Sequence, residues 1–163
     1  MKQLTIIYHS VTGGTRQMAD AVAQGAQSEP HCSVVCLPAQ QANPAHVLRA
    51  DGLVFACPEM LGSMSGLMKD FFDRCYYPVL DKLTGRAYAL LVCAGSDGQG
   101  AVRQVQRIAT GWRLKAVAEP LVVCTHAQTP ERIAQAKMID EPDLQRCRDL
   151  GAAVAAGLSL GMY

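Results

Sequence analysis

The sequence has neither a long apolar run nor an excess of charge of one sign. No stretch reaches the 18 consecutive apolar residues typical of a membrane-spanning helix, and the amino-terminal apolar run is too short for a signal peptide. Fifteen basic and fourteen acidic residues leave a formal net charge of +1. That balance predicts no nucleic-acid surface and no polybasic membrane patch. Nucleic acids and membranes are therefore not expected as partners.

Paired cysteine motifs are also missing, although the chain contains seven cysteines. The number is odd, no C-x-x-C occurs, and several cysteines lie inside apolar runs, as small buried hydrophobic residues do. No H-x-x-H and no mixed Cys/His cluster predicts a metal site. This cysteine usage favours a reducing, cytoplasmic compartment.

Several common signatures of ligand binding and catalysis are absent as well. No G-K-[ST] completes a Walker A loop, and no G-x-G-x-x-G fingerprint follows the first apolar run. No G-x-S-x-G elbow indicates a hydrolase. A receiver domain would carry an aspartate at the end of the third strand, where this chain has Cys57 and Pro58.

What the chain does have is an alternation of short apolar runs with amphipathic segments. Half of the residues are apolar, enough for a buried sheet within one domain over residues 1–163. The alternation predicts an α/β fold with a doubly wound, five-stranded parallel sheet of order 2-1-3-4-5 and helices on both faces. The expected strands are residues 2–8, 31–38, 51–58, 86–95 and 115–124, and the main expected helices are residues 16–27, 44–50, 64–77, 100–112 and 141–160.

Two prolines refine this pattern near the end of the chain. Pro120 lies within the fifth strand and predicts an edge position, because proline cannot donate to a strand ladder. Pro130 directly follows Thr129, a pair typical of a helix start. A short extra helix is therefore expected within residues 125–140.

The loop after the first strand, HSVTGGT, combines hydroxyl groups with adjacent glycines. Gly13 and Gly14 permit close approach of the backbone to a ligand, and Ser10, Thr12 and Thr15 supply hydroxyl donors. The following helix points its amino terminus at the same place, which favours a bound anion. The loop predicts a phosphate cradle; a plain glycine-rich turn with a threonine cap is the alternative.

Two segments carry a resemblance to a known family. Residues 10–15 match the phosphate loop of flavodoxin-like FMN proteins, [ST]-x-T-G-x-T, at every specified position. Residues 57–74 resemble the segment P-x-x-x-G-[SN]-M-[SA]-x-x-[ML]-K-x-F-x-D-R of the NAD(P)H-dependent oxidoreductase branch, which includes the multimeric tryptophan-repressor-binding-protein-like quinone reductases. The resemblance implies a flavodoxin-like fold with FMN bound between these loops.

A third loop, residues 93–100, is glycine- and serine-rich like the loop that contacts the flavin pyrimidine in that branch. Asp97 within it is either an acceptor for flavin N3–H or a turn residue or helix cap. The resemblance implies these cofactor-binding residues: Ser10, Thr12, Gly13, Gly14, Thr15, Pro58, Glu59, Met60, Leu61, Gly62, Ser63, Met64, Ala94, Gly95, Ser96, Asp97 and Gly98.

The chain also departs from its relatives beside the flavin. Related proteins carry aromatic residues where Met60 and Leu61 stand, so the ring is expected to stack less firmly on an apolar wall. His9 is expected at the end of the first strand, facing solvent. Cys57 has no partner cysteine and no activating base, so no redox role is assigned to it. No residue is assigned a catalytic role.

The resemblance implies an enzyme in which FMN takes hydride from NADH or NADPH and passes electrons to a small acceptor such as a quinone or a free flavin. Two alternatives stay open: an electron-transfer flavodoxin that serves protein partners, and a flavodoxin-fold regulatory scaffold. Flavodoxin carriers are typically acidic and clamp the ring with aromatic side chains, which residues 57–64 lack. A homodimer or tetramer is expected from the resemblance alone.

Overall fold

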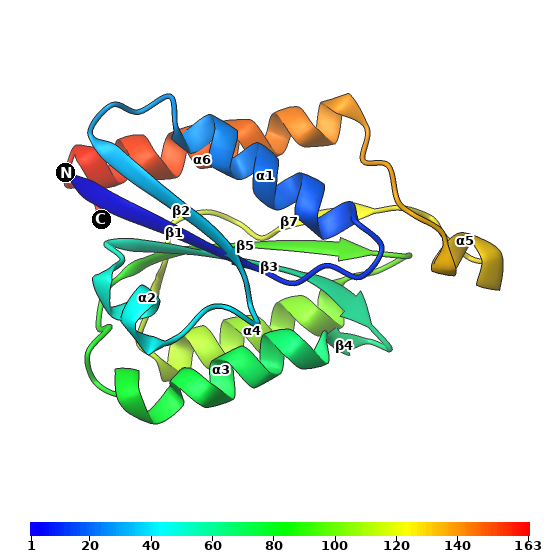
Figure 1. Cartoon of the computed structure of the whole chain (residues 1–163), viewed down its shortest axis with the longest axis horizontal. Helices are drawn as coiled ribbons and strands as arrows, with labels where there is room; N and C mark the ends of the chain where they lie inside the picture. The colour runs from blue at the N-terminus through cyan, green and yellow to red at the C-terminus, as the bar shows by residue number, and fades with distance from the viewer.

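A computed structural model describes the whole chain, from Met1 to Tyr163, as a parallel sheet between two layers of helices (Figure 1). The sheet order is β2-β1-β3-β5, with two short strands beside the far edge of β5. This confirms the expected doubly wound fold. The strands are β1 (Lys2–Tyr8), β2 (Cys32–Pro38), β3 (Gly52–Met60), β4 (Ser63–Met64), β5 (Ala87–Ala94), β6 (Lys115–Ala116) and β7 (Leu121–Cys124).

The edge of the sheet beyond β5 is made of two strands, where the sequence predicted one. β6 pairs with the start of β5, and β7 pairs with its end. Pro120 lies between the two short strands and has no N–H to continue the ladder. The edge position was predicted correctly, whereas the unbroken strand over residues 115–124 was wrong.

Helices cover both faces of the sheet. The helices are α1 (Gly14–Ala26), α2 (Pro44–Arg49), α3 (Gly66–Val79), α4 (Gln99–Gly111), α5 (Pro130–Ala134) and α6 (Glu141–Ser159). The pair α1 and α6 lies on one face, and α3 and α4 lie on the other (Figure 1). The short α5 begins as predicted, since the Thr129 side chain accepts a hydrogen bond from the Arg132 N–H. None of the helices combines the length and the apolar character needed to cross a membrane.

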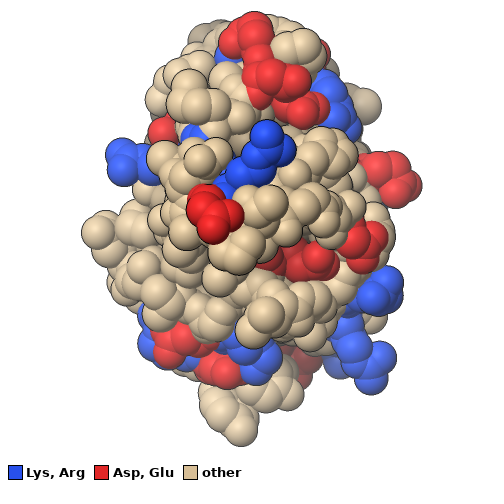
Figure 2. Space-filling model, turned by 90° about the vertical axis from the view of Figure 1, so that its right-hand side faces the viewer, with Lys and Arg blue, Asp and Glu red and all other residues tan.

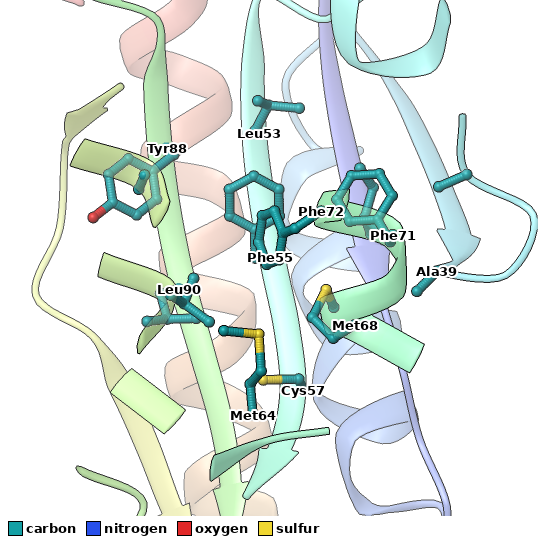
Figure 3. Packing of buried hydrophobic residues seen from close by; sticks show 14 of the residues in the cluster. Ala39, Leu53, Phe55, Cys57, Met64, Met68, Phe71, Phe72, Tyr88 and Leu90 are labelled. Atoms are coloured by element: carbon teal, nitrogen blue, oxygen red, sulfur yellow. The ribbon is translucent and has the colours of Figure 1, made fainter. Parts of the chain in front are cut away.

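Aromatic packing fixes the α3 and α4 layer against the sheet. The ring centroids of Phe55 on β3 and Phe72 on α3 are 5.0 Å apart, and the Trp112 ring lies 5.2 Å from Phe72. Figure 3 shows the rings of Phe55 and Phe72 close together, with the sulfur-containing side chains of Cys57 and Met64 nearer the carboxyl end of β3. Such edge-to-face contacts stabilise the packing of α3 and α4 against β3.

β3 extends beyond its predicted end and turns back into β4. Glu59 pairs with Met64 and Met60 with Ser63, in an antiparallel hairpin. The two turn residues, Leu61 and Gly62, have φ values of 53° and 72°, as a tight type I′ turn requires. Glycine adopts this conformation freely, whereas leucine does so at a cost of about 1–2 kcal/mol.

Candidate cofactor site at the carboxyl edge of the sheet

A cavity of about 420 Å³ lies where the loops after β1, β3 and β5 meet. Its size is within the range of about 300–1,000 Å³ typical of small-molecule sites. Figure 2 looks onto this edge of the sheet and shows acidic and basic side chains interspersed in a larger uncharged surface. The expected residues that line the cavity are Ser10, Thr12, Gly14, Thr15, Pro58, Glu59, Met60, Ala94 and Gly95.

The loop after β1 has the geometry of an anion cradle. Gly13 has a φ of 92° and directly precedes α1, whose amino terminus carries no side-chain cap. The Gly13 N–H donates to the Ser10 Oγ over 3.2 Å, which closes the loop on itself. Thr12 and Thr15 are among the residues that line the cavity beside the start of the helix. Hydroxyl donors and an uncapped helix start suit a phosphate group.

Close packing explains why α1 begins with glycine. A β-carbon at Gly14 would lie 2.8 Å from the Cys93 Sγ and 3.3 Å from the Lys137 Cβ. A larger residue would therefore require the Cys93 side chain or the segment around Lys137 to shift. Burial raises the pKa of the Cys93 thiol to about 11, so this sulfur acts as a neutral packing group.

Glu59, at the end of β3, connects that strand end to the loop after β5 and the start of α4. Its Oε1 accepts a hydrogen bond from the Gly98 N–H over 3.0 Å, and its Oε2 accepts from the Gly100 and Ala101 N–H groups over 2.9 Å and 3.3 Å. The carboxylate thus caps α4 from a different element, where the helix dipole stabilises negative charge. It also places a fixed negative charge in the cavity wall.

Several expected residues lie near the cavity without lining it. Leu61 is fully exposed at the hairpin tip, so the expected apolar wall consists of Met60 alone. Asp97 is exposed, makes no hydrogen bond and does not cap α4. The expected residues outside the lining are Gly13, Leu61, Gly62, Ser63, Met64, Ser96, Asp97 and Gly98.

One side of the cavity comes from a segment that contains none of the expected cofactor-binding residues. Residues 125–140, which we call the strap, leave the carboxyl end of β7 and carry α5 beyond the sheet edge (Figure 1). The only signal in the sequence was the position of the strap directly after the last strand. The lining residues missed by sequence reasoning are Val11, Cys93, Thr125, Ala127, Ile133, Ala134 and Lys137.

The Gln17 side chain connects the strap to the loop after β1, residues 9–15, which we call the phosphate-type loop. Its Nε2 donates to the carbonyl oxygens of Gly13 and Lys137 over 3.0 Å and 2.7 Å, and its Oε1 accepts from the Ile139 N–H over 3.1 Å. The Lys137 N–H also donates to the Thr12 carbonyl oxygen over 2.8 Å. One side chain of α1 therefore couples the loop and the strap.

The ammonium group of Lys137 brings positive charge to the strap side of the cavity. Its Nζ donates to the carbonyl oxygens of Ile133 and Gln135 over 2.8 Å and 2.7 Å, which closes the end of α5. No carboxylate is paired with this ammonium group. The strap therefore favours a negatively charged ligand at this side of the cavity.

The expectation that His9 faces solvent was wrong. His9 is only 9% exposed. Its backbone N–H donates to the Ala56 carbonyl oxygen and so continues the β1–β3 ladder. The Nδ1 atom of its ring lies 2.7 Å from the Ser65 Oγ. Burial lowers the pKa of the His9 imidazole. Burial also raises the pKa of the Cys57 thiol to about 12, which disfavours its thiolate form.

Solved structures place this arrangement in the flavodoxin-like class. A flavodoxin from the domain Archaea matches with a TM-score of 0.77 and 18% identity, over 96% of this chain and 98% of its own. A flavodoxin, WrbA-like protein from Agrobacterium tumefaciens matches with a TM-score of 0.71 and 22% identity, over 98% of this chain and 99% of its own. At these identities the likeness shows the fold alone.

The family follows from the sequence itself. The model of the NADPH-dependent FMN reductase family matches residues 17–129, and the chain therefore belongs to that family. This confirms the resemblance to flavodoxin-like FMN proteins of the NAD(P)H-dependent branch, and with it FMN as the cofactor.

Two named relatives match part of the chain. A flavodoxin of Aquifex aeolicus (strain VF5) is 37% identical over 100 residues, which cover 61% of this chain and 52% of the relative. An NAD(P)H dehydrogenase (quinone) of Acidithiobacillus ferrooxidans is 31% identical over 94 residues, covering 45% of this chain and 47% of the relative. The chain thus spans about half the length of the curated relatives that it matches.

Proposed function

We propose that the chain is an oxidoreductase that uses FMN to transfer electrons from NADPH or NADH to a small acceptor such as a quinone or a free flavin. The observation that carries the proposal is the cavity formed by a phosphate-type loop, the Pro58–Met60 strand end and the loop after β5. Family membership supports the donor. The name of the Acidithiobacillus relative, NAD(P)H dehydrogenase (quinone), supports a quinone as the acceptor.

The residues of the cavity fit the parts of FMN. Ser10, Thr12 and Thr15, with the start of α1, would hold the phosphate, and the Pro58–Met60 strand end would face the flavin ring. FMN, when bound, supplies the two-electron chemistry. The protein supplies a fixed, partly apolar cavity. The negative charge of the Glu59 carboxylate in the cavity wall would disfavour a gain of negative charge by the flavin.

The test is an anaerobic titration of the FMN-reconstituted protein, followed by the visible absorption of the bound flavin. Addition of NADPH or NADH is expected to bleach the flavin rapidly, and a quinone added afterwards is expected to restore the colour. A protein that binds FMN but is reduced by neither donor would contradict the proposal. The same amount of free FMN, measured alone, corrects for reduction in solution.

The second candidate function is that of an electron-transfer flavodoxin. The 37% identity with the Aquifex flavodoxin favours it. The near-neutral charge and the lack of aromatic side chains at the hairpin speak against it. A protein that both nicotinamide donors leave oxidised, but that a reduced carrier protein reduces, would establish this alternative.

The assembly that we propose with this function is a homodimer or tetramer. Exposed apolar side chains surround the cavity, and they would be covered by a second subunit. They are Val11, Met60, Leu61, Ile133 and Met138. Light scattering coupled to size-exclusion chromatography measures the mass of the particle, and a monomer at all concentrations would contradict the proposal.

A further inference from the structure

A second cavity, of about 500 Å³, lies on the other side of the β3–β4 hairpin. Glu59 and Met60 line the first cavity, and their cross-strand partners, Met64 and Ser63, line the second. The two cavities share no lining residue, and each strand of the hairpin lines one of them. The second cavity is lined by Ser63, Met64, Gly66, Lys69, Gln104, Arg107 and Ile108.

The side-chain groups of this second cavity are rich in hydrogen-bond donors and positive charge. Arg107, on α4, is exposed and makes no hydrogen bond or ion pair within the protein. Gln104 accepts through its Oε1 from the Ser63 Oγ over 2.8 Å and from the Met64 N–H over 2.9 Å. Its amide NH₂ is therefore left free to donate. No carboxylate lines the cavity.

Lys69 adds a second positive charge from α3. Its Nζ pairs with Asp73 over 2.7 Å, but both side chains are more than half exposed, so the pair contributes little and is easily exchanged for another anion. Asp73 itself is not part of the lining. Two cations thus line one cavity from two different helices, and such a combination suits a phosphate group.

We infer that this second cavity binds a phosphate monoester, namely the 2′-phosphate at the adenosine end of NADPH. The inference rests on the proposed function, because it requires the nicotinamide end of the same molecule to reach the first cavity across the shared hairpin. Arg107 supplies a planar fork that bonds phosphate oxygens in pairs, and Lys69 supplies a point charge. NADH has no 2′-phosphate and leaves both cations without a ligand. The chain is therefore selective for NADPH over NADH.

The first test compares the two donors in steady-state turnover. Arg107→Ala is expected to lower the ratio of kcat/KM for NADPH to kcat/KM for NADH by about tenfold to a hundredfold, as expected for loss of hydrogen bonds between charged groups. Arg107→Lys keeps the charge but loses the planar guanidinium group, and its ratio is expected to lie between those of Arg107→Ala and the unaltered protein. Arg103→Ala is the matched control, since Arg103 is exposed on the same helix and lies outside the cavity. An unchanged ratio in Arg107→Ala overturns the inference.

The second test needs no turnover. Calorimetry on the protein incubated with FMN compares adenosine 2′,5′-bisphosphate with adenosine 5′-monophosphate. The bisphosphate is expected to bind more tightly, and this advantage is expected to disappear in Arg107→Ala. If neither donor reduces the flavin but this advantage is seen, the proposed function fails while the phosphate site stands. Equal binding of the two nucleotides by the unaltered protein overturns the site.

Discussion

At the scale of single residues, the candidate site depends on one left-handed backbone position. Gly13, with a φ of 92°, joins the phosphate-type loop to α1. Gly13→Val is expected to abolish FMN binding, because a β-branched residue is barred from this conformation and must reshape the loop. Titration of flavin fluorescence measures the binding, and circular dichroism checks that the protein remains folded.

A second glycine provides the control for this variant. Gly85 has a φ of 78°, lies before β5 at the opposite end of the sheet, and has open space around it. Gly85→Val therefore carries a comparable backbone cost without touching the cavity, and it is expected to bind FMN normally. If Gly13→Val bound FMN stoichiometrically, the assignment of the phosphate-type loop as the site of the FMN phosphate would be wrong.

A buried histidine makes the stability of the protein dependent on pH. Because burial lowers the His9 pKa below its ordinary value of about 6.5, the unfolded chain binds more protons than the folded chain just below that pH. The stabilising contribution is complete above about pH 6.5 and is lost as the pH falls toward the lowered pKa. Acidification through this window is therefore expected to reduce the free energy of unfolding.

Urea unfolding at about pH 5 and about pH 8 measures this effect. His9→Gln is expected to make the free energy of unfolding less dependent on pH, whereas His31→Gln, at an exposed position, is expected to behave like the unaltered protein. An identical pH dependence in His9→Gln and the unaltered protein would show that the imidazole of His9 titrates normally.

At the scale of elements, the start of α4 relies on a side chain from β3. Glu59→Ala removes the carboxylate that accepts from Gly98, Gly100 and Ala101, and it is expected to lower the free energy of unfolding by about 1.5–3 kcal/mol. Chemical denaturation measures the change. Glu119→Ala, at an exposed position without hydrogen bonds, is expected to stay within about 0.5 kcal/mol of the unaltered protein. Equal stability of the two variants would contradict a capping role.

Most elements could be predicted from the sequence because each of the longer strands carries a short, mainly apolar run. β1 has the predicted bounds, and its buried residues contact the cores on both faces. The β3–β4 hairpin could not be predicted in this way, because Leu61 followed by Gly62 is not one of the usual turn pairs. The break between β6 and β7 was only partly signalled, since Pro120 indicated the edge but not the loss of pairing.

The candidate site was predictable where a local motif forms it. The phosphate-type loop is one continuous stretch, and its hydroxyl residues line the cavity as expected. Glu59 was expected near the cofactor, but its capping of α4 joins residues 39 to 42 positions apart and has no local signature. The strap and the second cavity likewise arise only when distant segments come together.

At the scale of the whole molecule, Gln17 links the strap to the body of the protein. Gln17→Ala removes three hydrogen bonds that hold Gly13, Lys137 and Ile139. Each bond contributes about 0.5–1.5 kcal/mol, so the strap is expected to open more often and trypsin to cleave it faster at Arg132 and Lys137. Mass spectrometry of timed digests measures the cleavage rate at each site.

FMN bound to the phosphate-type loop is expected to slow this cleavage, because the loop and the strap share the Gln17 contacts. Gln24→Ala, on the exposed side of α1, is the control and is expected to be digested like the unaltered protein. Equal rates of digestion of Gln17→Ala and Gln24→Ala would contradict the role of Gln17 in holding the strap to the phosphate-type loop.

The β3–β4 hairpin is the only pair of strands joined by a tight turn, and this has a consequence for how the protein folds. Every other strand pair closes a long crossover, which makes folding slow. FMN meets its full set of contacts only after the loops that follow β1, β3 and β5 have been brought together. Bound FMN is therefore expected to stabilise the folded chain by slowing its unfolding rather than by speeding its folding.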